Sequence, residues 1–585
     1  MVDDLGIYYD ATCPSRIESL IGSPHSESER ARARQLIQLW QAAGVSKYNH
    51  LRDLDSMPTE PRWKALQDAI SSGPYVLVAD QTFGDVSINY GLAEASSFHR
   101  MLDAALAENP GFKVVLKVHP AVVAGHKQGH FDLQKLACDP RVIILGEDVH
   151  PVSLIRRAEA VYVVTSQMGF EGLLWGKRVR VFGMPFYAGW GLTVDELKAP
   201  GRRHAVTLED LVHAALIEYP RYIDPETKCR CEAERLIEWM GHQRRMRERF
   251  PAELYALGFS PWKKPIVEDF LQGSSIQFVK NANAVPPGAT LVVWGRKPIP
   301  GDLAEGVSLI RLEDGFLRSV GLGAELVRPV SWVIDDEGIY YDASAPSRLE
   351  SLLRTTQFDA DLLSRAARLR EAICSGGITK YNVGTEQWQR PPGVQRVILV
   401  PGQVETDASI RYGAPGIRRN MDLLKAVREE NPDAYLLYKP HPDVREALRK
   451  PGEGESNARQ WCDEVVGDVP FAQLLQAVDE VHVLTSLAGF EALLRNKPVV
   501  CYGQPFYSGW GLTRDMLPHP RRGRRLSLDE LVAATLILYP TYISRTTGKF
   551  TTPERALAEL IEWRTEGRSR RPLWRRLIAR ILRKD

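Results

Sequence analysis

Two aspartates, Asp85 and Asp407, are candidates for covalent or proton-transfer chemistry. Each lies four residues after a glutamine, Gln81 or Gln403, on a predicted loop that follows a short apolar run. A carboxylate on a loop at the end of a strand can act as a nucleophile or a general base. The alternative is that each aspartate only caps the helix that follows it.

A lysine and a histidine follow the next predicted strand in both halves of the chain, at Lys117 and His119 and again at Lys439 and His441. Open α/β sheets bind their ligands at the carboxyl ends of the strands. A cation and a ring N–H at that edge suit a phosphate or a carboxylate group. The alternative is a structural histidine in front of a rigid proline.

A third pair of motifs places two hydroxyl side chains between a predicted strand and a predicted helix. A hydroxyl can cap the helix, whose free N–H groups form an anion site, and a glutamate one turn later could accept hydrogen bonds from ribose hydroxyls. The alternative is an ordinary capping motif with an acidic first turn. The residues are Thr165, Ser166, Gly169 and Glu171 in the first motif and Thr485, Ser486, Gly489 and Glu491 in the second.

One further acidic motif occurs only once. Glu313 and Asp314 precede Gly315, and Arg318 follows shortly after. Adjacent acids before a glycine indicate a turn. That turn either belongs to a functional site or has only a structural role.

Short apolar runs separated by helical patterns must position these motifs. In the first half of the chain they cover residues 75–79, 114–116, 142–145 and 161–164, and in the second half 397–400, 435–438 and 481–484. Strands that alternate with helices predict an α/β fold with doubly wound, Rossmann-like parallel sheets.

The motifs recur because the sequence contains one large module twice. We predict a first module over 1–243, a linker over 244–288, a second module over 289–563 and a basic tail over 564–585. The first module begins at the equivalent of about residue 334, and the stretch 291–332 has no counterpart in it. We therefore expect the first module to lack part of its amino-terminal domain.

Composition excludes several classes of protein. The net charge of the 585 residues is +2, so we expect no nucleic-acid partner. Seven cysteines do not match between the copies, which favours a reducing compartment over a disulfide framework. Cys229 and Cys231 lack a partner pair at zinc-site spacing, so we expect no metal. Without a secretory signal or an apolar span of roughly 18 residues, we expect a cytoplasmic protein.

The basic tail has the pattern of an amphipathic helix. Pro572 suits the first helical turn, and apolar and basic residues divide between two faces. Such a helix suits the anionic inner-membrane surface, to which we expect the protein to bind peripherally. The alternatives are a helix docked on its own protein and a solvated tail. The apolar face holds Leu573, Trp574, Leu577, Ile578, Ile581 and Leu582.

Together these motifs resemble the bacterial capsule polysaccharide β-Kdo transferases of the KpsC type. The most specific matches are the duplicated Pro-Phe-Tyr-x-Gly-Trp-Gly-Leu-Thr, at 185–193 and 505–513, with the paired Lys-x-His-Pro and Gly-Phe-Glu motifs. The resemblance implies two tandem GT-B-like modules and CMP-β-Kdo as donor. It also implies a lyso-phosphatidylglycerol-linked Kdo acceptor and retention of configuration, with a β-2,4 linkage made by the first module and a β-2,7 linkage by the second.

The resemblance also implies roles for the candidate residues. Asp85 and Asp407 would be nucleophiles, and His119 and His441 would contact the phosphate of CMP or the carboxylate of Kdo. The glutamine, lysine, threonine, serine, glycine and glutamate residues named above would bind the nucleotide sugar. Glu313, Asp314 and Arg318 would face the acceptor, and no cofactor is expected.

Two alternatives stay open at this point. Only the second module could be catalytic, with the first as a structural remnant. The chain could instead be a non-catalytic, glycolipid-binding component that works with the proteins of capsule export and assembly. Retention of Asp85 and Asp407 in both copies argues against the second alternative.

Overall fold

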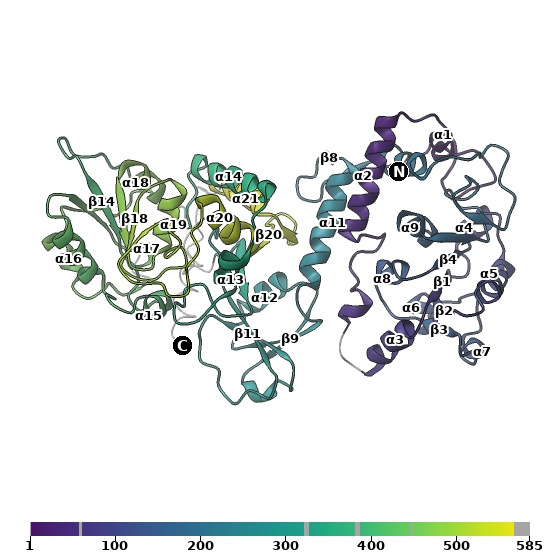
Figure 1. The fold of residues 1–585 in the computed structure, drawn as a ribbon, viewed down its shortest axis with the longest axis horizontal. Coiled ribbons are helices and arrows are strands. Elements are labelled where there is room, and N and C mark those ends of the chain that lie inside the picture. The colour runs from purple at the N-terminus through teal and green to yellow at the C-terminus, as the bar shows by residue number, and fades with distance from the viewer. Residues whose placement is uncertain (1, 58–60, 321–326, 381–385, 446–448, 567–585) are drawn as a thin grey trace. The chain divides into compact units, whose positions relative to one another are not determined.

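The computed structural model describes residues 2–57, 61–320, 327–380, 386–445 and 449–566. The chain forms two compact units, Met1–Ala252 and Glu253–Asp585. Figure 1 labels the elements of both units.

The first unit is built on one parallel six-stranded sheet. Its strand order, β3-β2-β1-β4-β5-β6, is the Rossmann order and confirms the predicted doubly wound fold. A separate antiparallel pair joins Tyr222–Ile223 (β7) to Arg230–Cys231 (β8). The sheet strands are Tyr75–Ala79 (β1), Lys113–Lys117 (β2), Val142–Leu145 (β3), Ala160–Val163 (β4), Arg178–Val181 (β5) and Val194–Asp195 (β6).

Helices cover both faces of this sheet, so its central strands β1 and β4 are apolar and buried at every position. On β1, Leu77 packs in the core with Phe170, whereas its neighbour Val78 packs on the other face with Phe98. The helices are Arg16–Ile21 (α1), Glu27–Ala43 (α2), Pro61–Ser71 (α3), Val86–Tyr90 (α4), Ala95–Glu108 (α5), Pro120–Val123 (α6), Leu133–Leu136 (α7), Pro151–Ile155 (α8), Met168–Leu174 (α9), Leu208–Val212 (α10), the π-helix His213–Glu218 (η2) and Ala233–Glu248 (α11).

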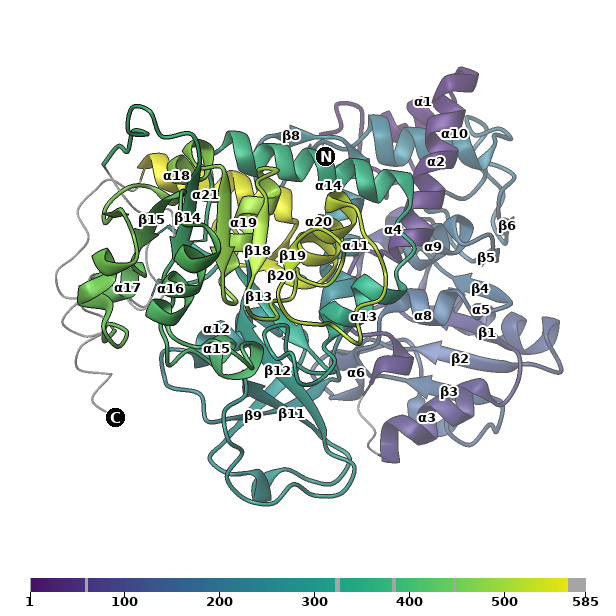
Figure 2. The ribbon, with the colours of Figure 1, turned by 60° about the vertical axis from the view of Figure 1, so that its left-hand side comes forward.

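The second unit repeats this sheet in the order β16-β15-β14-β17-β18-β19. Figure 2 shows its labelled strands among their helices. Ile398 on β14 packs with Leu424, and the next residue, Leu399, packs on the other face with Phe490. The strands are Val397–Pro401 (β14), Tyr435–Lys439 (β15), Glu464–Val465 (β16), Glu480–Val483 (β17), Val499–Cys501 (β18) and Arg514–Asp515 (β19).

A second, seven-stranded sheet completes this unit and gives it the two-domain arrangement predicted as GT-B-like. Its order is β10-β9-β11-β12-β13-β20-β21, parallel from β10 to β12 and antiparallel beyond. The described residues of the first unit hold only β7 and β8 in place of such a sheet. The strands are Glu253–Leu257 (β9), Ser275–Val279 (β10), Thr290–Trp294 (β11), Ser308–Asp314 (β12), Ser331–Asp335 (β13), Pro540–Ile543 (β20) and Phe550–Thr551 (β21).

The predicted linker over 244–288 is therefore wrong for most of its length. It contains the end of α11, then β9, helix α12 (Lys264–Phe270) and β10. The charged residues and prolines in this range pointed to a linker. The two short strands β9 and β10 are recognised from their pairing within the larger sheet.

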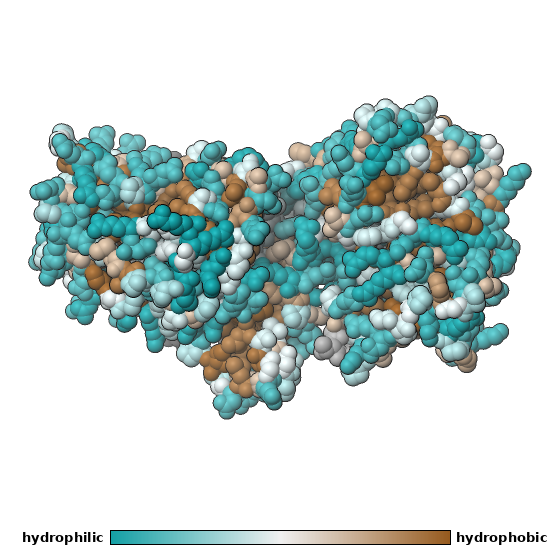
Figure 3. All heavy atoms as spheres, viewed as in Figure 1, coloured by the Kyte–Doolittle hydropathy of each residue, from teal (hydrophilic) through white to brown (hydrophobic). Residues whose placement is uncertain are grey.

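The remaining helices of the second unit surround its two sheets. Figure 3 shows hydrophilic side chains over most of the viewed face of each unit, with hydrophobic patches near β9 and β11 and also on the first unit. Within the described part of the chain, no helix is long and apolar enough to cross a membrane. The helices are Arg348–Thr355 (α13), Ala360–Ser375 (α14), Ala408–Gly413 (α15), Asn420–Glu430 (α16), Pro442–Arg445 (α17), Phe471–Ala477 (α18), Leu487–Leu494 (α19), Leu528–Val532 (α20), the π-helix Ala533–Leu538 (η6) and Pro553–Glu566 (α21).

The duplicated Gly-Phe-Glu and Pro-Phe-Tyr motifs pack against each other. The Tyr507 hydroxyl donates a hydrogen bond to the carbonyl of Ser486, and its ring lies over Gly489. A Cβ atom at Gly489 would lie only 2.7 Å from Cζ of Tyr507. Tyr187 and Gly169 repeat this arrangement in the first unit. The glycines are thus kept for packing, because only they let the tyrosine reach the strand–helix turn.

We expect Gly489→Ala to destabilise the second unit by about 1–3 kcal/mol, because the added methyl group must displace the buried Tyr507 ring. The free energy of unfolding from urea titrations would measure the change. Gly523→Ala is the matched control, since a Cβ there meets nothing within 4 Å. Equal effects of the two substitutions would contradict this packing role.

Candidate active site

A cavity of ≈ 760 Å³ lies between the two sheets of the second unit. Asp407 and His441 line it from loops after β14 and β15, and Glu313 and Asp314 line it from the end of β12. All four therefore lie at or just after the carboxyl ends of strands, where open α/β sheets bind ligands. The structure thus brings the predicted carboxylates and histidine of this unit into one cavity.

Asp407 both caps a helix and faces the cavity, so the two interpretations of this residue are compatible. Its Oδ1 accepts a hydrogen bond from the backbone N–H of Ser409 at 3.0 Å, at the start of α15. Asp85 accepts from Ser87 in the same way at 3.0 Å in the first unit. The cap holds one oxygen of each carboxylate in a defined direction.

His441 is held in one tautomer by its own backbone. Its Nδ1 accepts a hydrogen bond from the N–H of Asp443 at 3.1 Å, so the neutral ring carries its proton on Nε2. His119 accepts from the N–H of Ala121 at the same distance. Burial lowers the pKa of His441, which favours the neutral ring near neutral pH.

The two motif lysines hold neighbouring loops. Lys439 Nζ donates to the carbonyls of Gly467 and Val469, both at 2.8 Å. Lys117 Nζ donates to the carbonyl of Glu147 at 2.8 Å. Burial lowers the pKa of both lysines to about 8. These contacts give the lysines a positioning role, and phosphate binding by them stays a prediction.

Gln403 joins the ends of two strands. Its Oε1 accepts from the N–H of Thr485 at 2.9 Å, and its Nε2 donates to the Thr485 hydroxyl at 3.1 Å. Gln81 and Thr165 form the same pair, with distances of 3.0 Å. The amide groups therefore position the loops that carry the nucleophile candidates, and a direct contact with the nucleotide sugar stays a prediction.

Ser486 and Glu491 are both held by the backbone around α19. The Ser486 hydroxyl caps the helix by accepting from the N–H of Ala488 at 3.2 Å, as Ser166 does from Met168 at 3.3 Å. Glu491 is buried, and its Oε1 accepts from the N–H of Lys380 at 2.6 Å. Burial raises the pKa of Glu491 to about 7. A ribose contact for this carboxylate stays a prediction.

Glu171 repeats this arrangement in the first unit. Its Oε1 accepts from the Ser46 hydroxyl at 3.0 Å and from the N–H of Lys47 at 3.1 Å. Burial raises its pKa to about 7 as well. In both units a buried glutamate of the Gly-Phe-Glu motif thus anchors a Ser/Thr-Lys segment of a distant loop.

Lys380 is a site residue that the motif search missed. It lines the cavity, where its charge opposes the burial-driven rise in the pKa of Glu313 and helps Arg318 to lower the pKa of Asp314. The signal was present in the sequence, because Ser-Lys-Tyr-Asn at 46–49 matches Thr-Lys-Tyr-Asn at 379–382. Lys263 was missed because it falls in the supposed linker. Its Nζ lies 3.0 Å from the ring centroid of Trp294, also in the cavity wall.

The adjacent acids Glu313 and Asp314 differ in their protonation. Burial and the neighbouring Asp314 charge raise the pKa of Glu313 to about 7. Burial opposes ionisation of Asp314 too, but Arg318 and Lys380 outweigh it and hold its pKa below the usual range. Arg318 Nε donates to Asp314 Oδ2 at 2.7 Å. One ionised acid therefore lies beside one that exchanges its proton near neutral pH.

The sequence of the chain is similar to those of known capsule proteins. A family model described as "Capsule polysaccharide biosynthesis protein" matches residues 1–222 and 302–543. The Neisseria meningitidis serogroup A "Capsule polysaccharide modification protein LipA" is 43% identical over 99% of this chain and 84% of its own length. The Rhizobium meliloti "Lipopolysaccharide-processing protein LpsZ" is 40% identical over 52% of this chain and 73% of its own length.

Two solved structures from Thermosulfurimonas dismutans also match. The "KpsC, beta Kdo 2,7 transferase" is 40% identical with a TM-score of 0.45, covering 53% of this chain and 99% of its own. The "KpsC, beta Kdo 2,4 transferase" is 34% identical with a TM-score of 0.48, covering 54% of this chain and 99% of its own.

We expect Glu491→Gln to stabilise the second unit above about pH 7 and to have little effect near pH 5. The unfolded chain loses the Glu491 proton near 4.5, whereas the folded protein holds it to about 7, so wild-type stability falls as pH rises between these values. Glutamine keeps the oxygen that accepts from Lys380 but cannot ionise. The gain at about pH 8 should be on the order of 2 kcal/mol in the free energy of unfolding.

Urea titrations at about pH 5 and pH 8 would measure this difference. Glu371→Gln, on the exposed face of α14, is the matched control and should change stability little at either pH. A gain for Glu491→Gln that does not depend on pH would rule out ionisation as its cause.

Proposed function

Because the chain belongs to the capsule polysaccharide biosynthesis protein family, we propose that it is a retaining glycosyltransferase that moves Kdo from CMP-β-Kdo to a lipid-linked Kdo acceptor. The observation that carries the proposal is the cavity of the second unit. It holds Asp407 and His441 on one side and the acid pair Glu313 and Asp314 on the other. The reaction that we propose uses no cofactor.

In the first step, the Asp407 carboxylate attacks the anomeric carbon of Kdo and the bond to the CMP phosphate oxygen breaks. CMP leaves with the bonding electron pair, and a covalent Kdo–Asp407 ester forms. His441 supports this step, because its Nε2–H can donate a hydrogen bond to the departing phosphate or to the Kdo carboxylate. Oδ1 of Asp407 is held by the helix cap, so Oδ2 is the oxygen that attacks the sugar.

In the second step, an acceptor hydroxyl attacks the same carbon from the side that CMP left, and Asp407 departs as a carboxylate. Two inversions restore the original configuration. Glu313 is the base that we assign to the hydroxyl proton, since its pKa of about 7 suits proton uptake near neutral pH. Arg318 keeps Asp314 ionised beside it.

We propose the same nucleophilic role for Asp85, because the first unit repeats the cap, the glutamine–threonine pair and the histidine tautomer. The alternative is that only the second unit transfers Kdo. The lyso-phosphatidylglycerol anchor and any contact with export proteins are further proposals that rest on the resemblance.

We expect Asp407→Asn and Asp85→Asn each to stop Kdo addition at a different product, because neither amide can form the ester intermediate. Each loss should be about 10³-fold or more for the step concerned. The measurement is transfer from CMP-Kdo to a Kdo-primed lipid, followed by mass spectrometry of the products.

Asp433→Asn and Asp103→Asn, both exposed, are the matched controls in the two units and should leave transfer unchanged. Normal products from Asp85→Asn, together with no transfer by Asp407→Asn, would support the single-site alternative. Full activity in both variants would disprove the nucleophile assignment.

Binding of the protein to an anionic membrane surface is a separate proposal. It rests on the basic tail over 564–585, and residues 567–585 lie outside the described residues. We expect deletion of residues 573–585 to abolish sedimentation with vesicles that contain phosphatidylglycerol, because the apolar face that would insert is lost. Leu577→Glu with Ile581→Glu is the full-length comparison. Sedimentation that survives both changes would contradict the proposal.

A further inference from the structure

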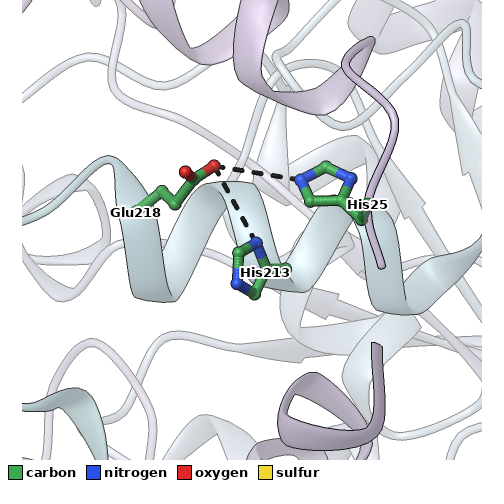
Figure 4. Close-up of side chains that lie close together, drawn as sticks. All are labelled: His25, His213 and Glu218. Atoms are coloured by element: carbon green, nitrogen blue, oxygen red, sulfur yellow. Dashed lines mark ion pairs between the residues drawn. The ribbon is translucent and has the colours of Figure 1, made fainter. Parts of the chain in front are cut away.

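Two histidines and a glutamate meet in the first unit, far in sequence from its Asp85 and His119 motifs. Figure 4 shows His25 and His213 turned toward the carboxylate of Glu218. Glu218 Oε2 lies 3.8 Å from Nε2 of His25 and 3.8 Å from Nδ1 of His213. One ligand atom from each of the three residues lies within 4.8 Å of the others.

The local fold produces this arrangement. His213 and Glu218 are the first and last residues of the π-helix η2, and their spacing of five residues matches its hydrogen-bond repeat, which places them on one face. His25 comes from the loop before α2, directly ahead of the helix-capping Ser26. The cluster therefore joins two segments that are almost 190 positions apart in the chain.

The imidazole nitrogens of this cluster have unmet bonding capacity. Both ring nitrogens of His25 and Nδ1 of His213 are buried and make no hydrogen bond within the described residues. The His25 and His213 side chains are only 3% and 6% exposed. Buried polar atoms without partners destabilise a fold, so an ion, a ligand or an ordered water is expected to satisfy them.

The second unit shows that this position does not need polar residues. Counted from the matching helix caps, Phe358 stands in place of His25, Ala533 in place of His213 and Leu538 in place of Glu218. Ala533 belongs to the hydrophobic core of that unit, and the partly buried Phe358 packs against it. The same helices thus pack with apolar side chains, and the His-His-Glu set is a feature of the first unit that packing does not explain.

A carboxylate stands behind one of the histidines, as is usual at metal centres. Asp210 Oδ1 lies 3.4 Å from Nδ1 of His25, on the ring edge away from Glu218. Arg30 and Thr207 hold this carboxylate, with hydrogen bonds of 2.8 and 2.7 Å. Metal-binding histidines commonly donate their second ring N–H to such a carboxylate, which sets the tautomer and orients the ring.

We propose that His25, His213 and Glu218 bind one divalent transition-metal ion of the Zn²⁺ class. Two imidazoles and one carboxylate form a recognised zinc ligand set. Ligand atoms around tetrahedral zinc are about 3.3 Å apart, so the two 3.8 Å spacings and the third separation, within 4.8 Å, must all contract when the ion binds. Glu218 is 41% exposed, so the ion can enter from solvent and water can take the fourth position.

The ion would fasten the loop before α2 to η2. This is a structural role, and it does not depend on the proposed transferase activity. Cys229 is exposed and Cys231 is half-buried, so these two thiols of the same unit could bind zinc in place of the histidine and glutamate side chains. A test must therefore separate nitrogen and oxygen ligands from sulfur.

The test is equilibrium dialysis of the chelator-treated full-length protein against Zn²⁺, with bound metal measured by mass spectrometry. We expect about one high-affinity Zn²⁺ per chain and a rise in the melting temperature of the first unit. The triple variant His25→Phe, His213→Ala, Glu218→Leu carries the residues of the second unit and should lose this site, with affinity lowered about tenfold or more. Circular dichroism without metal would check its fold.

Two controls make the result decisive. Cys229→Ser with Cys231→Ser, and separately His126→Ala at an exposed histidine, should keep the site. Bound Co²⁺ should show d–d bands without thiolate charge transfer.

Should the triple variant not fold, Glu218→Gln replaces it and should weaken binding. The proposal fails if wild type binds no Zn²⁺, if the histidine and glutamate variants bind it normally, or if only the cysteine variant loses it.

Discussion

The site of the second unit depends on one buried carboxylate. Glu491 is enclosed by protein and accepts a hydrogen bond from the backbone of Lys380. An unpartnered carboxylate there would be strongly unfavourable, so the contact fixes the loop against α19. Lys380 then lines the cavity, where its charge opposes the rise in the pKa of Glu313 and helps to lower the pKa of Asp314. A residue expected to bind substrate thus holds the loop that brings a cation to the acid pair.

Other residues that are retained in both units also have a positioning role. Gln403 and Thr485 join the ends of two neighbouring strands, and Lys439 ties down the loop after a third. Each contact holds the end of a strand that lies close in sequence to Asp407 or His441. Retention of a residue in both copies therefore reports positioning as much as chemistry, and the two cannot be separated without the hydrogen-bond partners.

The duplication also lets each unit explain the other. Where both keep a residue, as with Glu171 and Glu491, the contact is the same in each. Where the two units differ in a side chain, the difference points to a role other than packing, because the same backbone arrangement forms with either residue. The apolar Phe358 and Ala533 show that the fold does not need histidines at the positions of His25 and His213. We therefore assign these two residues a role in the first unit alone, which is to bind an ion.

The sequence by itself determined the repeat, the doubly wound sheets and the placement of the motifs at strand ends, because these depend on local periodicity and short spacing. Only the tertiary structure showed that 253–279 contains strands, that Lys439 donates to carbonyls and that Lys263 and Lys380 reach the acid pair. Those facts rest on contacts between segments tens to hundreds of residues apart. Burial and partners, rather than residue type, then decide which charges persist and which side chains remain available for chemistry.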